Sequence, residues 1–221
     1  MNSVTKLLSE IAIAAVLLIL CGCSSNVLRQ QFDQPLDDHY PAITKGEQWE
    51  YSLEYTTPSA GLQRGTLTVN ADAEEQINGK YYLRTVTSFT GVSDFAASYT
   101  YYRKTAQGIY TIYGSHINAP EFVETPFPLT IGKTWVVPHP DGALQYTAEN
   151  IETVQAANQR YENCLKVSFR SQDQQSGFEG YSYHSPDFGE VKRVMKLNGS
   201  TIVYILKNHK PGRGYPTSAS R

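Results

Sequence analysis

The chain has 221 residues, with 19 basic and 21 acidic side chains, and its formal net charge at neutral pH is −2. This balance provides no basic field for nucleic acid, so no nucleic-acid partner is expected. The three cysteines are too few for a disulfide framework, and the fold must therefore depend on a hydrophobic core.

The N-terminal region has the pattern of an export signal. Lys6 supplies a positive start, and an unbroken apolar run extends from Ile11 to Leu20. Such a run fits the core of a signal peptide and is shorter than the roughly 20 apolar residues that cross a bilayer. It ends in Leu20-Cys21-Gly22-Cys23, which resembles the lipobox of bacterial lipoproteins.

The lipobox resemblance implies what happens to this region. Residues 1–22 would be a signal peptide, cleaved after Gly22, and Cys23 would carry the lipid (diacylglycerol and an acyl chain such as palmitate). In Gram-negative lipoproteins an Asp at the next position favours the inner membrane, whereas this chain has Ser24. We therefore expect lipid anchoring at the cell outer membrane, with the domain on the periplasmic face.

Two polar segments flank the predicted domain. Residues 23–45 contain prolines and no regular period, which is typical of a flexible tether. Asp37-Asp38-His39 lies in it, but a metal site there would have to order a flexible chain, and no metal ligand is predicted. Residues 208–221 are rich in Gly and Pro and are expected to be a mobile tail.

Residues 46–207 are predicted to form one antiparallel β-domain. Trp49, Tyr51, Leu53 and Tyr55 alternate with polar residues, and this period of two indicates a half-buried strand. Asn78-Gly79 is a two-residue hairpin signal. Further strands are expected at 66–71, 81–89, 99–104, 109–113, 146–154, 161–170 and 201–206. The last is apolar on both faces and is expected to be central, whereas residues 120–128 interrupt the pattern.

The pattern also suggests an internal duplication. Gly132-Lys133-Thr134-Trp135 repeats the spacing of Gly46-Glu47-Gln48-Trp49, and Gly189 takes the place of Gly108. Two related β-units are therefore expected, at about 46–118 and 128–207. No segment after residue 24 has sustained helical spacing. The predicted fold class is all-β, with an antiparallel sheet curled as a half-barrel or arranged as a two-layer sandwich.

Three stretches carry a family resemblance, namely residues 128–135 (PLTIGKTW), 161–167 (YENCLKV) and 183–193 (YHSPDFGEVKR). Together they resemble the TapB-like family of exported bacterial proteins, which is distantly similar to the half-barrels of LolA and LolB. The resemblance implies strands, turns and export, and it supplies no catalytic residue.

No motif predicts catalysis. The five histidines are far apart, and there is no G-x-S-x-G elbow and no phosphate-binding G-x-x-x-x-G-K-[ST] loop. Glu74 and Glu75 are expected to be solvated charges beside a hairpin. Cys164 could be a nucleophile, but without a nearby His a small strand residue is the better interpretation. No enzymatic activity, cofactor or metal site is predicted, and Cys23 is the one predicted site residue.

Tyrosine is unusually abundant, at 16 residues. Twelve fall on predicted strands: Tyr51, Tyr55, Tyr81, Tyr82, Tyr99, Tyr101, Tyr102, Tyr110, Tyr113, Tyr181, Tyr183 and Tyr204. They could line a groove for sugar rings, acyl chains or an unfolded partner, or simply suit a sheet with one wet and one dry face.

Three functions stay open. The first is a non-enzymatic envelope lipoprotein that binds a hydrophobic ligand or a protein partner. The second is a structural or assembly lipoprotein that acts through protein contacts, and an envelope hydrolase comes third. A deep cavity would favour the first function, and a flat exposed aromatic patch would favour the second.

Overall fold

The computed structural model describes residues 35–93, 95–114, 117–139, 142–173 and 177–212. They form an all-β fold, as predicted, with a short 3₁₀ turn, η1 (Asp37–His39). The strands are β1 (Gln48–Thr57), β2 (Gly61–Ile77), β3 (Lys80–Thr90), β4 (Ser98–Thr105), β5 (Gly108–Tyr113), β6 (Phe122–Pro126), β7 (Thr134–Val137), β8 (Leu144–Ala156), β9 (Gln159–Ser171), β10 (Glu179–Ser185), β11 (Gly189–Leu197) and β12 (Ser200–Lys210). Within these ranges, no helix is long and apolar enough to span a membrane. The predicted lipobox and Cys23 lie outside the described residues.

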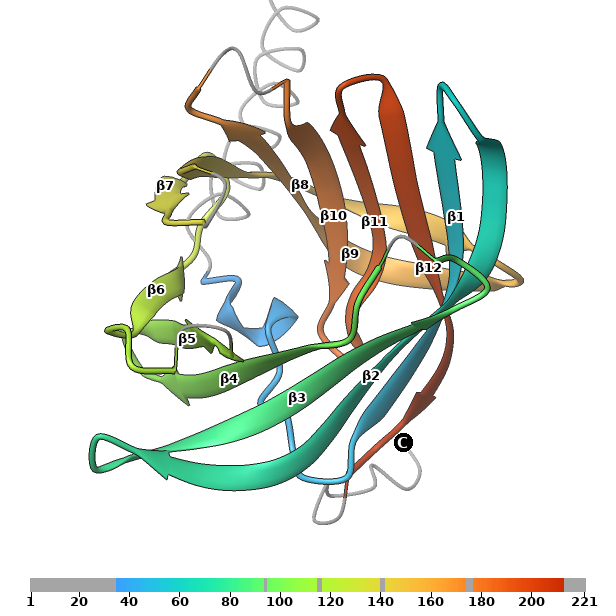
Figure 1. Ribbon diagram of the computed structural model, residues 1–221. Coiled ribbons are helices and arrows are strands. Elements are labelled where there is room, and N and C mark those ends of the chain that lie inside the picture. Colours follow the sequence, from blue (N-terminus) through green and yellow to red (C-terminus); the bar gives the residue numbers. More distant parts are fainter. Residues whose placement is uncertain (1–34, 94, 115–116, 140–141, 174–176, 213–221) are drawn as a thin grey trace, which may run out of the picture. The chain divides into compact units, whose positions relative to one another are not determined.

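All twelve strands belong to one antiparallel sheet in the order β6-β5-β4-β3-β2-β1-β12-β11-β10-β9-β8-β7. It consists of two six-stranded meanders that join where β1 pairs with β12, so the strand predicted at 201–206 is central, as expected. The sheet curls until its two edge strands, β6 and β7, approach each other (Figure 1). Of the two predicted forms, the curled single sheet is right, and it is nearly closed and barrel-like.

The alternating pattern accounts for most of the strands. Trp49, Tyr51 and Leu53 on β1 are buried while their neighbours are more exposed. The predicted turn joins β2 to β3, with φ angles of 50° at Asn78 and 77° at Gly79, in the left-handed region that hairpin turns of this kind require.

One strand lies in a stretch that was expected to contain no strand. β6 (Phe122–Pro126) lies inside the stretch expected to interrupt the sheet, so that prediction was wrong. β6 is an edge strand, where a proline without an N–H group is tolerated because one side of the strand has no ladder partner.

The two predicted halves share backbone detail at their first glycines. Gly46 and Gly132 have φ angles of 87° and 84°. Their N–H groups donate to the carbonyl oxygens of Ala71 and Ala148, both at 2.7 Å. The pairing register shifts just after each alanine, in β2 and β8. Both halves therefore have the same irregularity and the same hydrogen bond at this point of the sheet.

The two tryptophans occupy the expected matching positions. Trp49 on β1 is 6% exposed and Trp135 on β7 is 9% exposed. Each indole N–H donates to a backbone carbonyl, that of Phe188 at 3.0 Å and that of Glu124 at 2.7 Å. The Trp49 ring therefore connects β1 to the turn before β11, and the Trp135 ring connects β7 to β6.

The tether prediction is wrong from residue 35 onward. Residues 35–45, here called the N-terminal segment, pack inside the curve of the sheet (blue in Figure 1). Leu36 is buried and its N–H donates to the Leu129 carbonyl at 2.7 Å, while the Leu129 N–H donates to Oδ1 of Asp37 at 2.7 Å. The polar composition of the segment did not indicate this packing. Its polar side chains form hydrogen bonds with backbone atoms, while Leu36 and Tyr40 contribute apolar surface.

The predicted tail also begins too early. β12 continues to Lys210, and the Nε2 atom of His209 lies 2.8 Å from Oε1 of Glu47, which is itself buried. Only the part from residue 213 lies outside the described residues.

Candidate ligand-binding cavity

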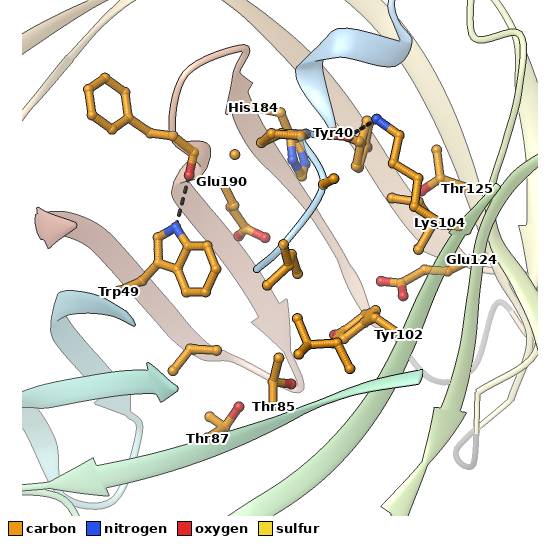
Figure 2. Close-up of a pocket in the computed structure, with 18 of the residues that line it drawn as sticks. Tyr40, Trp49, Thr85, Thr87, Tyr102, Lys104, Glu124, Thr125, His184 and Glu190 are labelled. Carbon is orange, nitrogen blue, oxygen red and sulfur yellow. Dashed lines mark hydrogen bonds between the residues drawn. The ribbon is translucent and has the colours of Figure 1, made fainter. Parts of the chain in front are cut away.

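The curled sheet forms a partly open cavity of about 550 Å³. Its wall is formed by the N-terminal segment together with residues of β1–β6 and β10–β12, so both halves of the duplication contribute (Figure 2). This volume falls within the range of roughly 300–1,000 Å³ that is usual for small-molecule sites.

Much of the wall is aromatic and apolar. Trp49 and Tyr51 of β1 face Leu67 and Val69 of β2, and the Tyr204 ring meets that of Tyr51 edge-on, with the ring centroids 5.3 Å apart. All twelve tyrosines expected on strands are on strands. Five of them line the cavity: Tyr51, Tyr81, Tyr82, Tyr102 and Tyr204. A sixth, Tyr40, comes from the segment that was expected to be a tether.

A charged pair lies in this largely apolar wall. Nε and Nη2 of Arg193 donate to the two carboxylate oxygens of Glu190, both at 2.7 Å. The two residues are three apart, a spacing that normally places side chains on opposite faces of a strand. The β10–β11 register skips Val191 at this point, and the irregularity lets both face inward. Although burial lowers the pKa of Arg193, the Glu190 carboxylate raises it well above its ordinary value.

A second carboxyl, Glu124 of β6, lies in the cavity beside Tyr102 and Thr125 (Figure 2). The Thr111 hydroxyl donates to its Oε2 atom. Burial raises the pKa of Glu124, while the bond from Thr111 and the charge of Arg193 act in the opposite direction.

His184 stands behind Tyr40, and the centroids of the two stacked rings are 4.5 Å apart. Burial, with contributions from Arg193 and His39, holds the pKa of His184 well below its usual range, so the imidazole is neutral at neutral pH. The Ser182 Oγ atom lies 2.8 Å from its Nε2 atom. Ser182 is 1% exposed and does not belong to the cavity wall, so a molecule in the cavity does not reach its hydroxyl.

The other residues considered from the sequence have structural positions. Cys164 is fully buried and burial raises the pKa of its thiol to about 11, which confirms the small core residue. Asp37 and His39 bond to backbone atoms, His39 through Nε2 to the Asn163 carbonyl at 2.8 Å. Glu74 is exposed at the cavity wall. Among the described residues, no group of three or more His, Cys, Asp or Glu side chains is placed to hold a metal ion.

The exposed surface shows no concentration of large apolar side chains on one strand. In the described part of the chain they lie on six different segments: Leu62, Tyr81, Tyr99, Ile117, Val136 and Leu197. The cavity is therefore the better candidate for a site.

Comparisons with known proteins assign no family. No family model matches the sequence, and no curated protein sequence matches it. A solved structure from Bacteroides fragilis, described as an exported protein with a YmcC-like fold, is 14% identical; the match covers 77% of this chain and 98% of that one, with a TM-score of 0.46. A second, described as a lipoprotein from Parabacteroides distasonis, is 13% identical and covers 78% and 98%, with a TM-score of 0.39.

Neither likeness identifies a function for this chain, and neither shows a link to the TapB-like family or to LolA and LolB. That resemblance stays a sequence-based expectation.

Sequence reasoning missed the charged residues of the cavity. Glu124 lies on the strand that was not predicted, and Glu190 faces inward because of an irregularity in register. β11 also contains Lys192 and Lys196, so the charges of Glu190 and Arg193 do not stand out in the sequence. Their pairing depends on the bulge, which leaves no signature in the sequence.

Proposed function

We propose that this chain is a non-enzymatic binding protein of the bacterial envelope that holds a small organic molecule in its central cavity. The observation that carries the proposal is the cavity of about 550 Å³, with its aromatic wall and a few buried charged groups. Cavities with this combination of apolar lining and a few oriented polar groups are the usual form of small-molecule sites.

The charged groups restrict the kind of ligand. A simple acyl chain would displace water from Glu124, Glu190 and Arg193 and offer no hydrogen bond in return, which costs free energy for each polar group left unpaired. A ligand with an apolar or aromatic body and a polar head satisfies both parts of the wall. The hydrophobic ligand expected from the sequence thus becomes an amphipathic one.

The same geometry favours binding over hydrolysis. The serine nearest to a histidine in the cavity region, Ser182, is buried behind the wall, and His184 is stacked against Tyr40. A nucleophile must reach the substrate to form a bond with it.

Native mass spectrometry after gentle extraction tests the proposal. We expect a bound organic molecule in the native protein and clearly less of it in Thr87→Trp, because Thr87 lines the cavity and an indole there takes up part of the space for a ligand. The matched control is Ser88→Trp, on the opposite face of the same strand, which should retain the ligand. A native protein that is always empty, or a Thr87→Trp protein that carries as much of the molecule as the native protein, would contradict the proposal.

The proposed location rests on the sequence Leu20-Cys21-Gly22-Cys23 and on Ser24 after it. It is a lipid anchor on Cys23 at the outer membrane. Replacing Cys23→Ser should leave the precursor uncleaved and unacylated, because the thiol is the group that receives the lipid. Mass spectrometry of the N-terminal peptide checks this, and a native N-terminus other than acylated Cys23 would rule the anchor out.

A further inference from the structure

The positively charged side chains of the cavity wall already have partners. Arg193 is held by both oxygens of Glu190, and Arg103 is paired with Glu121. Nζ of Lys104 donates to the backbone carbonyls of Asp37 and Tyr40. An anionic ligand would therefore have to compete with a carboxylate for either arginine.

The electrostatic situation of Glu124 is the opposite. Among the described residues no basic side chain forms an ion pair with it, and its hydrogen-bonding partner is the neutral hydroxyl of Thr111. The Arg193 charge is compensated by Glu190 and the Lys104 ammonium bonds to backbone carbonyls, so Glu124 is left without an ion pair among the described residues. A buried carboxylate without a counter-charge is costly, and a ligand that supplies the cation recovers that cost.

The surroundings of Glu124 suit an ammonium group attached to an apolar body. Tyr102 lies beside the carboxyl (Figure 2), and aromatic faces attract cations in sites from which water is displaced. Trp49 and Leu67, farther along the wall, are available to the apolar part of the molecule.

We propose that the ligand of this cavity is a small organic cation, an amine with an aromatic or apolar body, whose ammonium group donates to the carboxylate of Glu124. This inference rests on the proposed function and names the class of molecule that the cavity takes.

Three probes with one ring and different head groups test it: tyramine, which is cationic, tyrosol, its neutral alcohol, and 3-(4-hydroxyphenyl)propionate, which is anionic. Binding is measured by isothermal titration calorimetry on the native protein at neutral pH. Hydrogen bonds to charged groups contribute about 1.5–3 kcal/mol, so tyramine should bind at least about tenfold more tightly than tyrosol. The propionate should bind most weakly.

Two variants locate the preference. Glu124→Gln keeps the shape of the side chain and its contact with Thr111, removes a buried charge, and should bind tyramine and tyrosol equally. Glu74→Gln removes an exposed carboxylate from the same cavity wall and should keep the native preference. The selectivity of the native protein is itself a test, so the inference does not depend on the folding of either variant.

The outcomes separate the two proposals. Equal binding of all three probes would overturn the amine and leave a general binding cavity in place. An unchanged tyramine preference in Glu124→Gln would also overturn it. No binding of any probe would overturn it as well, and the co-purification experiment would then decide the proposed function independently.

Discussion

At the scale of single residues, one carboxylate connects side chains of β3 and β4 in the first half. Glu121, just before β6, accepts bonds from the Lys80 ammonium, the Tyr82 hydroxyl and the Arg103 guanidinium. Arg103 also lies over the Tyr110 ring, 4.4 Å from its centroid. Burial raises the pKa of Glu121, but the three donors outweigh it and lower that pKa to about 2. The ionised form is thus the one that the folded protein stabilises.

This predicts a specific dependence of stability on pH. The pKa of Glu121 falls from its ordinary value of 4.5 to about 2 on folding, so its contribution is complete above pH 4.5 and is lost as the pH falls towards 2. Glu121→Gln should lower the free energy of unfolding above pH 4.5 and reduce its decline at lower pH, as measured by urea denaturation. The control, Glu54→Gln, breaks an exposed ion pair with Arg64 and should change little. Parallel pH profiles for native and Glu121→Gln proteins would refute the prediction.

At the scale of elements, the alternating strands were predictable from the sequence, whereas the N-terminal segment and β6 were not. The strand around Trp49, the Asn78-Gly79 turn and the repeated Gly-x-x-Trp corner depend on local pattern, which sequence records. The N-terminal segment depends on the space inside the curled sheet, and β6 depends on the free edge of the neighbouring strand. Their residues are polar or rich in proline, and their order comes from contacts with chain far away in sequence.

The same division applies to the candidate site. The strand tyrosines were predictable because aromatic residues suit strands. Their convergence on one cavity required the curvature of the sheet. The inward-facing Glu124 and the inward pair of Glu190 and Arg193 required an edge strand and a bulge, so they could be recognised in the structure alone.

The N-terminal segment should behave as part of the fold. Leu36 is buried against Leu129, and replacing a buried Leu by Ala typically costs about 2–5 kcal/mol. We expect Leu36→Ala to lower the free energy of unfolding by an amount in that range. Asp38→Ala, two residues away and exposed, is the control and should be close to neutral. Urea denaturation measures the free energy of unfolding of both variants. Identical values would contradict this prediction and favour a flexible tether.

At the scale of the whole sheet, closure depends on side chains. β6 and β7 are the two edges of the twelve-stranded order, and no ladder joins them. Instead, Nζ of Lys133 donates to the backbone carbonyls of Pro126 and Pro128, and the Trp135 indole donates to that of Glu124. These bonds use carbonyls of the β6 region that would otherwise lie at a free edge. The seam, meaning β6, β7 and these bonds, also supports Glu124 in the cavity.

A seam held by side chains should open more readily than the ladder between β1 and β12. Lys133→Met keeps most of the apolar stem and removes the charged donor, so amide hydrogens of β6 and β7 should exchange faster while those of β1 and β12 stay unchanged. Losing bonds from a charged group should also cost about 1.5–3 kcal/mol of stability. Lys207→Met, which breaks an exposed pair with Glu50 on β12, is the control and should leave the seam unaffected. Hydrogen exchange read by mass spectrometry decides the matter, since a uniform increase over all strands would show that the seam does not open as a separate unit.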